Sequence, residues 1–207
     1  ESHVHGQKSY NGVAIISKKK LDNVKTDIIK DKLKQSRIIS AEVEHNKKKI
    51  QLINIYTPNG NPVDTPKYEY KKNWLDDLIK KLKSLSKTNK NIILAGDFNV
   101  IPAAEDVYNP KSFEDDALYR LEIRKKFREI LFSGLTNIVR LFYKPGEIYS
   151  FWDYQKASWE RNYGLLIDHF LLSPKLSCIV ERIFFEKEYR GKQKPSDHIP
   201  LWIKLSI

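Results

Sequence analysis

Residues 92–99, which read Ile-Ile-Leu-Ala-Gly-Asp-Phe-Asn, indicate the fold more clearly than any other part of the chain. An apolar run of this length that ends in turn residues is typical of a strand buried on both faces of a sheet. The run ends in a carboxylate and an amide two residues apart, and positions i and i+2 of an extended chain share a face. Asp97 and Asn99 are therefore expected to point at one spot, with an Asx turn that caps the strand as the alternative.

Apolar, β-rich runs recur on both sides of this strand and predict a sheet-based domain. We expect further strands at residues 12–17, 37–44, 49–56, 149–154, 165–172, 178–185 and 201–205. Helical spacing of apolar residues predicts helices at 66–86 and 114–133, with Gly134 as the stop of the second. Because strands outnumber helices and a hairpin is expected around 45–48, the pattern predicts one α/β domain over residues 1–207, with packed mixed β-sheets and helices.

Composition restricts the classes of protein that are possible. The chain has 207 residues, 41% of them hydrophobic, and a formal net charge of +11, which allows one substantial core and argues against a disordered chain. No apolar run approaches the ~18 residues that a transmembrane helix needs. The single cysteine, Cys178, excludes an internal disulfide framework and favours a reducing compartment, the cytoplasm. The charge favours a polyanionic partner such as nucleic acid, although lysines that only solvate the surface explain it equally well.

Polar residues also stand at the ends of other predicted strands. Tyr56 ends one strand, Asp168 interrupts the apolar run 164–172, and Asp197 and His198 directly precede the last strand. An unpaired buried carboxylate is costly, so Asp168 needs a partner. Metal-assisted attack of water on a phosphodiester requires side chains of the kinds found at these strand ends: carboxylates, an imidazole, an amide and a phenol. Converging carboxylates need a cation or a charged histidine beside them, and hard oxygen ligands favour Mg²⁺ or Mn²⁺.

Five short motifs connect these residues to a known family. They are Tyr-Thr-Pro-Asn at 56–59, Gly-Asp-Phe-Asn at 96–99, Ser-Phe-Trp-Asp-Tyr at 150–154, Gly-Leu-Leu-Ile-Asp-His at 164–169 and Pro-Ser-Asp-His at 195–198. In this order the motifs resemble the exonuclease III family of apurinic/apyrimidinic endonucleases, within the endonuclease/exonuclease/phosphatase superfamily. The turn at 6–14 is similar too, so the resemblance covers nearly the whole chain. It implies a DNase I-like, four-layer α/β sandwich and a DNA-repair nuclease that cuts 5′ to abasic sites, with 3′–5′ exonuclease or 3′-phosphatase activity at the same centre.

The resemblance also implies a role for each matched residue. Asp97 orients or deprotonates the attacking water, and Asn99 holds that water and the phosphate. Tyr56 contacts the phosphate near the leaving group. Asp168 holds His198, which stabilises charge on the phosphoryl oxygens.

Metal and substrate positions follow from the same resemblance. The implied ligands of Mg²⁺, with Mn²⁺ as a substitute, are Asp97, Asn99, Asp197 and His198. The implied substrate contacts are Tyr10, Asn59, Phe151, Leu165 and Ile167. Of these, the last three match an apolar pocket for an extrahelical abasic sugar, and such a pocket selects damaged sites because an intact stacked nucleotide does not enter it.

One part of the family pattern has no match in these residues. The family begins with a strand–helix–strand unit that carries a metal-site Asn and a metal-binding Glu. The resemblance therefore implies that residues 1–207 are the larger C-terminal part of such a domain. We expect a monomer that acts on duplex DNA with abasic or damaged 3′ ends and does not bind membranes. The alternatives are a less specific nuclease or phosphoesterase of the same superfamily, and an inactive fragment that binds DNA by charge alone.

Overall fold

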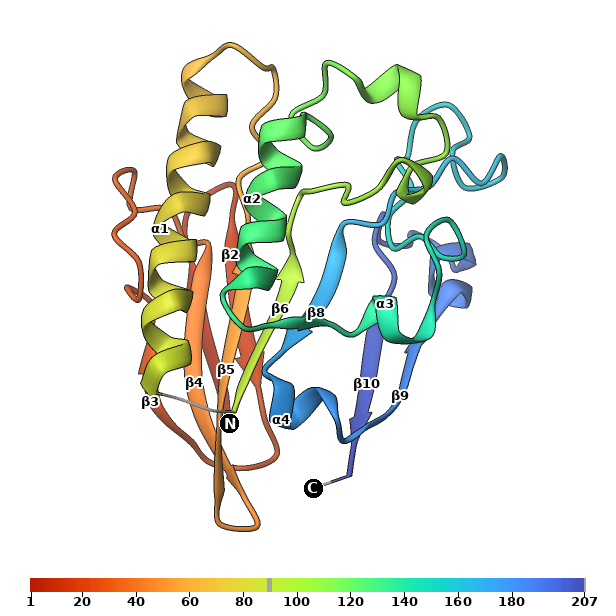
Figure 1. Ribbon diagram of the computed structural model, residues 1–207. Coiled ribbons are helices and arrows are strands. Elements are labelled where there is room, and N and C mark those ends of the chain that lie inside the picture. Colours follow the sequence, from red (N-terminus) through yellow and green to blue (C-terminus); the bar gives the residue numbers. More distant parts are fainter. Residues whose placement is uncertain (89–90, 207) are drawn as a thin grey trace.

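A six-stranded mixed β-sheet forms the centre of the protein in the computed structural model, which describes residues 1–88 and 91–206 (Figure 1). The strand order is β3-β4-β5-β6-β8-β7. These strands comprise Leu21–Lys25 (β3), Ile38–His45 (β4), Lys48–Tyr56 (β5), Ile92–Asp97 (β6), Asp168–Leu172 (β8) and Thr136–Asn137 (β7). Strand β6 pairs in parallel with β5 and antiparallel with β8, so it lies inside the sheet, as its continuous apolar run predicts.

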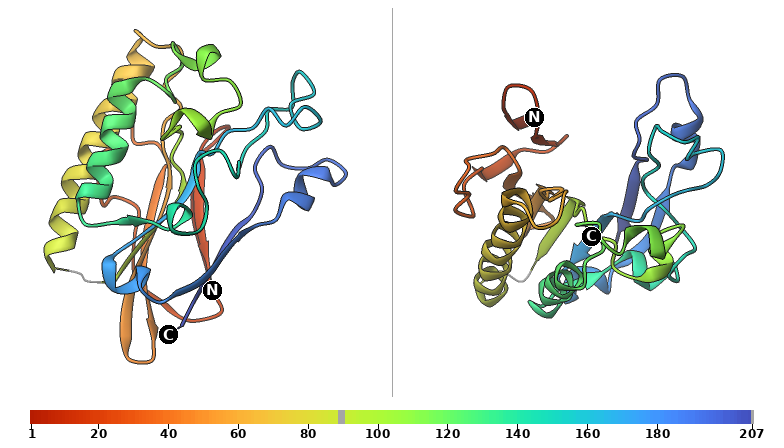
Figure 2. Two further views of the ribbon diagram at one scale, coloured as in Figure 1. Left: turned by 45° about the vertical axis from the view of Figure 1, so that its right-hand side comes forward. Right: turned by 90° about the horizontal axis from the view of Figure 1, so that it is seen from above.

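Two long helices, α1 (Pro66–Thr88) and α2 (Leu121–Phe132), lie on one face of this sheet (Figures 1 and 2). Alternate strand residues such as Ile53 and Leu94 pack against the apolar stripes of the helices. The intervening positions of β5 and β6, which include Tyr56 and Asp97, must then face the other side of the sheet. That side carries the candidate site.

Two β-hairpins form the second layer, on the side of the sheet opposite the helices (Figure 2). One pairs β1 (Ser2–Gly6) with β2 (Gly12–Ile16), and the other pairs β9 (Val180–Phe185) with β10 (Leu201–Leu205). The first hairpin is tied to the sheet by Asn54, whose Nδ2 donates to the carbonyl of Ala14 at 2.9 Å. The predicted mixed α/β architecture with packed sheets is therefore confirmed.

Several predicted element boundaries were wrong, and the strands β1, β3 and β7 were not predicted. The second helix begins at Leu121 rather than at Glu114, because Asp116 accepts the backbone N–H of Leu118 at 2.7 Å and forms a turn instead of continuing a helix. Its neighbour in the chain, Ala117, donates its backbone N–H to the side chain of Asn61 at 2.9 Å. The side chain of Asn61 thus fixes this turn from another loop.

The predicted strands at 149–154 and 165–172 also differ from the structure. Phe151 and Leu165 form only isolated bridges, and β8 starts at Asp168. The backbone of residues 165–167 forms hydrogen bonds with two different loops. The carbonyl of Leu165 accepts the N–H of Phe151 at 3.0 Å, and the carbonyl of Ile167 accepts the N–H of Phe98 at 2.9 Å. A regular ladder is replaced by a junction of loops beside the ends of β5 and β6.

The remaining helices are short. They are α3 (Val139–Phe142), α4 (Pro174–Ser177) and the 3₁₀ turns at Ala104–Asp106, Pro110–Phe113 and Lys187–Gly191. Among the residues that the structure describes, no helix is long and apolar enough to cross a bilayer.

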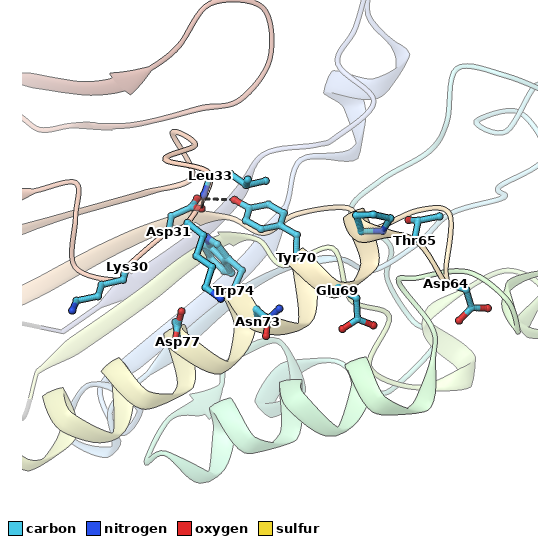
Figure 3. Close-up of a pocket in the computed structure, with 12 residues that line it drawn as sticks. Lys30, Asp31, Leu33, Asp64, Thr65, Glu69, Tyr70, Asn73, Trp74 and Asp77 are labelled. Atoms are coloured by element: carbon cyan, nitrogen blue, oxygen red, sulfur yellow. Dashed lines mark hydrogen bonds between the residues drawn. The ribbon is translucent and has the colours of Figure 1, made fainter.

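A cavity of about 800 Å³ lies between α1 and the loop that precedes β4 (Figure 3). Tyr70 of α1 reaches across it and donates its hydroxyl to Asp31 at 2.6 Å. Its other charged lining residues are Lys30, Lys32, Asp64, Glu69 and Asp77. Acids outnumber lysines here, and no predicted site residue lies in it, so this cavity is a poor surface for a phosphate backbone.

Candidate active site

The carboxyl end of β6 brings the reactive side chains together. In the sheet register Asp97 lies beside Tyr56 of β5 and opposite Asp168 of β8. A bridge between Phe151 and His198 brings in the segment that precedes β10. A cavity of about 460 Å³ opens at this edge, and its lining includes the predicted residues Tyr56, Asn59, Asp97, Asn99, Phe151, Leu165, Ile167, Asp197 and His198.

The approach of β5 to β6 depends on Gly96. Its φ is +130°, and a Cβ atom there would lie 2.0 Å from the carbonyl oxygen of Ile55. Any other residue would push the two strands apart or change the backbone conformation. The glycine of the Gly-Asp-Phe-Asn motif therefore places Asp97 directly next to Tyr56.

Asn99 holds the carboxylate of Asp97 in one orientation. Its backbone N–H donates to Asp97 Oδ1 at 2.8 Å and its Nδ2 donates to Asp97 Oδ2 at 2.9 Å. The same Nδ2 donates to the carbonyl of Thr57 at 2.9 Å, and Asn99 Oδ1 accepts the amide of Asn59 at 3.4 Å. The Asx turn considered for this strand end is present, and it also forms one wall of the cavity.

His198 is held by Asp168, which is held in turn by Ser150. His198 Nδ1 lies 2.8 Å from Asp168 Oδ2, and the hydroxyl of Ser150 donates to the same oxygen at 2.7 Å. Ser150 Oγ also accepts the backbone N–H groups of Ile167 and Asp168, both at 3.1 Å. This fully buried serine fixes the carboxylate, and the carboxylate fixes the orientation of the imidazole.

The charges at this edge favour a protonated His198. Burial by itself lowers the pKa of His198, but the neighbouring carboxylates, with Asp168 as the strongest, outweigh burial and raise it to about 9. Burial, followed by repulsion from Asp168, raises the pKa of Asp97 to about 7. A cationic imidazole thus faces a carboxyl group that is able to accept or release a proton near neutral pH.

The oxygen atoms at this edge fit a hydrated divalent cation. Mg²⁺ is usually held by one or two carboxylates and keeps several waters, and Asp97, Asn99 and Asp197 offer such oxygens on the cavity wall. Within residues 1–88 and 91–206, no three His, Cys, Asp or Glu side chains gather into a ready-made metal cluster. The set therefore fits a partly hydrated ion better than a closed structural site.

An apolar wall adjoins the reactive edge. Phe151, Leu165 and Ile167 pack in one cluster, and the ring of Phe151 meets the ring of His198 edge to face at a centroid distance of 5.0 Å. Aromatic residues that the sequence did not single out extend this wall: Tyr108 stacks on Tyr163 at 4.3 Å, and both line the cavity.

Tyr10 and Asp168 are the predicted site residues that do not line the cavity. Tyr10 lies outside it on the turn between β1 and β2 and is 82% exposed. Asp168 does not line the cavity itself but bonds to His198, which does. Asp106, on the loop that precedes Tyr108, is fully buried and pairs with Arg140.

Ser150 and Lys71 are supporting residues that the sequence interpretation missed. Ser150 lies within the Ser-Phe-Trp-Asp-Tyr motif, but a serine gives no sign of which partner it will meet. Lys71 carried a usable signal, because it occupies a position in the apolar stripe of α1 with Tyr68, Trp74 and Leu75. A lysine at such a position is rare unless it has buried partners.

The strand ends bring together a carboxyl group, a cationic imidazole and oxygen atoms suited to a hydrated divalent ion. This combination is typical of a hydrolase that acts on phosphate esters. Residues 2–198 match the sequence model of the Endonuclease/Exonuclease/phosphatase family, and the chain belongs to that family. It is a hydrolytic nuclease, and nucleases of this family generally depend on a divalent metal.

Individual relatives agree with this assignment. The exodeoxyribonuclease of Bacillus subtilis (strain 168) is 29% identical over 203 residues, which cover 97% of this chain and 77% of the relative. A 3′ phosphatase, NExo, from Neisseria bound to a product DNA hairpin superposes with a TM-score of 0.91 at 32% identity, over 100% of this chain and 79% of that chain. An AP endonuclease from Archaeoglobus fulgidus also gives a TM-score of 0.91, at 30% identity and with the same coverages. The predicted family, fold class and role as a DNA-repair nuclease are confirmed.

Proposed function

We propose that the chain hydrolyses the phosphodiester on the 5′ side of abasic sites in duplex DNA. The observation that carries the proposal is that one cavity of about 460 Å³ contains both the reactive edge and the apolar wall. A sugar without a base, turned out of the helix, would rest on Phe151, Leu165 and Ile167 with its phosphate beside Asp97 and His198. A stacked nucleotide with its base would not fit against this wall.

Each side chain then has one task. Asp97, oriented by Asn99, accepts a proton from the attacking water. Cationic His198, held by Asp168, donates a hydrogen bond to a phosphoryl oxygen as negative charge develops there. His198 was also expected as a metal ligand, but a positively charged imidazole favours contact with the phosphate over contact with a metal cation. Tyr56, which lies beside Asp97 in the register of β5 and β6, contacts the phosphate near the leaving group through its hydroxyl.

A divalent cation, Mg²⁺ or Mn²⁺, would be held by Asp97, Asn99 and Asp197. When bound it would neutralise the carboxylates and polarise the phosphate. The likeness to a 3′ phosphatase supports a second activity at the same centre, because removal of a 3′-terminal phosphate requires the same attack on phosphorus.

An abasic-duplex nicking assay tests the proposal, with Mg²⁺, with Mn²⁺ and with EDTA. It is run on this chain and on a longer chain that includes any residues encoded upstream of Glu1. Intact duplex, a 3′-phosphate duplex and phospholipid are the comparison substrates. We expect metal-dependent cleavage of the abasic duplex at a rate at least tenfold above that of intact duplex. If the longer chain binds duplex DNA but does not cut the abasic duplex with Mg²⁺ or Mn²⁺, the proposal fails.

The apolar wall is tested by a matched pair of variants. Leu165 lines the cavity and is 5% exposed, whereas Leu135 is 6% exposed in the core between sheet and helices. We expect Leu165→Ala to lower the preference for abasic over intact duplex at least about tenfold, since even one methylene group in a hydrophobic pocket changes selectivity by roughly 10- to 200-fold. Leu135→Ala should leave the preference unchanged. Equal effects of the two variants would argue against a sugar pocket.

A further inference from the structure

Lys71 is a fully buried lysine on α1, with 0% of its surface exposed. A buried ammonium group must have hydrogen-bond partners to offset its lost hydration. No ion pair formed within the described ranges 1–88 and 91–206 includes Lys71. Its partners are backbone carbonyl groups instead.

Three carbonyls accept from Lys71 Nζ. They belong to Asn59 at 2.9 Å, Asn99 at 2.6 Å and Ala117 at 3.0 Å. An ammonium group has three N–H donors, so each donor has one acceptor. The acceptors lie on three separate segments, residues 57–62, 98–101 and 114–120, which we call the three site loops.

Each site loop carries side chains that line the catalytic cavity. The first carries Asn59 and Asn61, the second carries Asn99, and the third carries Asp116 and Leu118. The loops also contact one another directly, but only in pairs: Asn59 bonds to Asn99 at 3.4 Å, and Asn61 bonds to Asp116 and Ala117. Lys71 is the group that all three share.

The turn at Gly60 packs directly against the side chain of Lys71. Gly60 has a φ of +87°, and a Cβ atom there would lie 2.6 Å from Lys71 Cδ. The turn that carries Asn59 therefore closes directly over the lysine stem. Burial lowers the pKa of Lys71 to about 7, while Asp116 and Asp97 favour its charged form. The three carbonyl acceptors also favour the charged form, because a neutral amine has only two N–H donors.

We propose that Lys71 is a positioning residue of the active site, which sets Asn59, Asn99 and the 114–120 turn at their working distances from Asp97 without touching the substrate. The proposal rests on the nuclease function proposed above. A helix on one face of the sheet thereby controls the geometry of a site on the other face, because the lysine reaches past the ends of β5 and β6 to the loops.

The test compares Lys71→Met and Lys71→Gln with Leu75→Ala. Leu75 is also fully buried on α1, one turn further along, so its truncation destabilises the same helix without removing a loop contact. The complete protein is assayed on abasic duplex with Mg²⁺ at a temperature at which every variant is folded. We expect kcat to fall about 10- to 100-fold in both Lys71 variants, as a displacement near 1 Å implies, with the Kd for duplex changed less than twofold. Leu75→Ala should keep kcat within twofold of the wild type.

Amide hydrogen exchange provides a readout that does not depend on activity. In the Lys71→Gln protein, exchange should accelerate together in all three site loops, and in the Leu75→Ala protein it should not. If exchange is unchanged in the site loops, or if the loss of kcat merely equals that of Leu75→Ala, the positioning role is wrong. A wild-type protein that cuts no abasic duplex would contradict the nuclease proposal, and the exchange experiment would still decide the role of Lys71.

Discussion

Replacing Ser150 by alanine should be more damaging than its small change in volume suggests. The hydroxyl donates to Asp168 Oδ2 at 2.7 Å and accepts two backbone N–H groups at 3.1 Å. A hydrogen bond to a charged group contributes about 1.5–3 kcal/mol, and a buried donor left without a partner costs about 1–3 kcal/mol. With one such bond lost and two N–H groups left without their acceptor, the loss of unfolding free energy should be at least about 3.5 kcal/mol, or roughly 10 °C in Tm for a chain of this size.

Ser133 provides the matched control. It is also buried, at 6% exposure, but its hydroxyl makes one bond, to the carbonyl of Ile130 at 2.6 Å. Its replacement by alanine should cost about 1 kcal/mol. Urea unfolding, followed by tryptophan fluorescence, measures both variants.

The Ser150 variant should also lose activity where it remains folded. Without the hydroxyl, Asp168 loses a hydrogen-bond donor and holds His198 less rigidly. We therefore expect kcat to fall. Duplex binding depends on the basic surface and should stay the same. If Ser150→Ala and Ser133→Ala lose equal stability and equal kcat, Ser150 is ordinary packing and the reasoning is refuted.

Three further outcomes are expected. Gly96→Ala should abolish folding or expression, whereas Gly191→Ala, which meets no atom within 4 Å, should be silent; soluble, active Gly96→Ala protein would contradict the close strand approach. His169 is buried, and burial followed by the charge of Arg140 lowers its pKa from 6.5 to about 3. The stability due to neutral His169 is therefore present above pH 6.5 and lost as the pH falls toward 3, which amounts to about 2 kcal/mol between pH 7 and pH 5. Urea unfolding of His169→Phe should lack that part of the acid sensitivity, and an unchanged pH slope would count against it. Asp77→Lys, in the acidic cavity of Figure 3, should leave nicking and its salt dependence unaltered, and a marked change in either would place DNA on that surface.

The sheet centre and the catalytic motifs are local properties, so they could be predicted from the sequence. The apolar run at 92–95 excludes an exposed strand, and the Asp–Phe–Asn that follows makes its own turn through bonds between residues two apart. Local signals fail where a residue's partner is far away in the chain. Asp116, for example, lies in a turn where the helix was predicted to begin, and Asn61 of another loop donates to its carboxylate at 3.1 Å.

What the sequence by itself determined was which residues carry the chemistry, because each motif places a reactive side chain at a strand end. The tertiary structure alone decided how those side chains are held and charged. The pKa of about 9 for His198 arises from carboxylates on different strands and loops, and the shared anchor of three loops is a lysine from the opposite face of the sheet. Both depend on burial and on distances between segments far apart in the chain, and electrostatic and hydrogen-bond energies depend steeply on those distances.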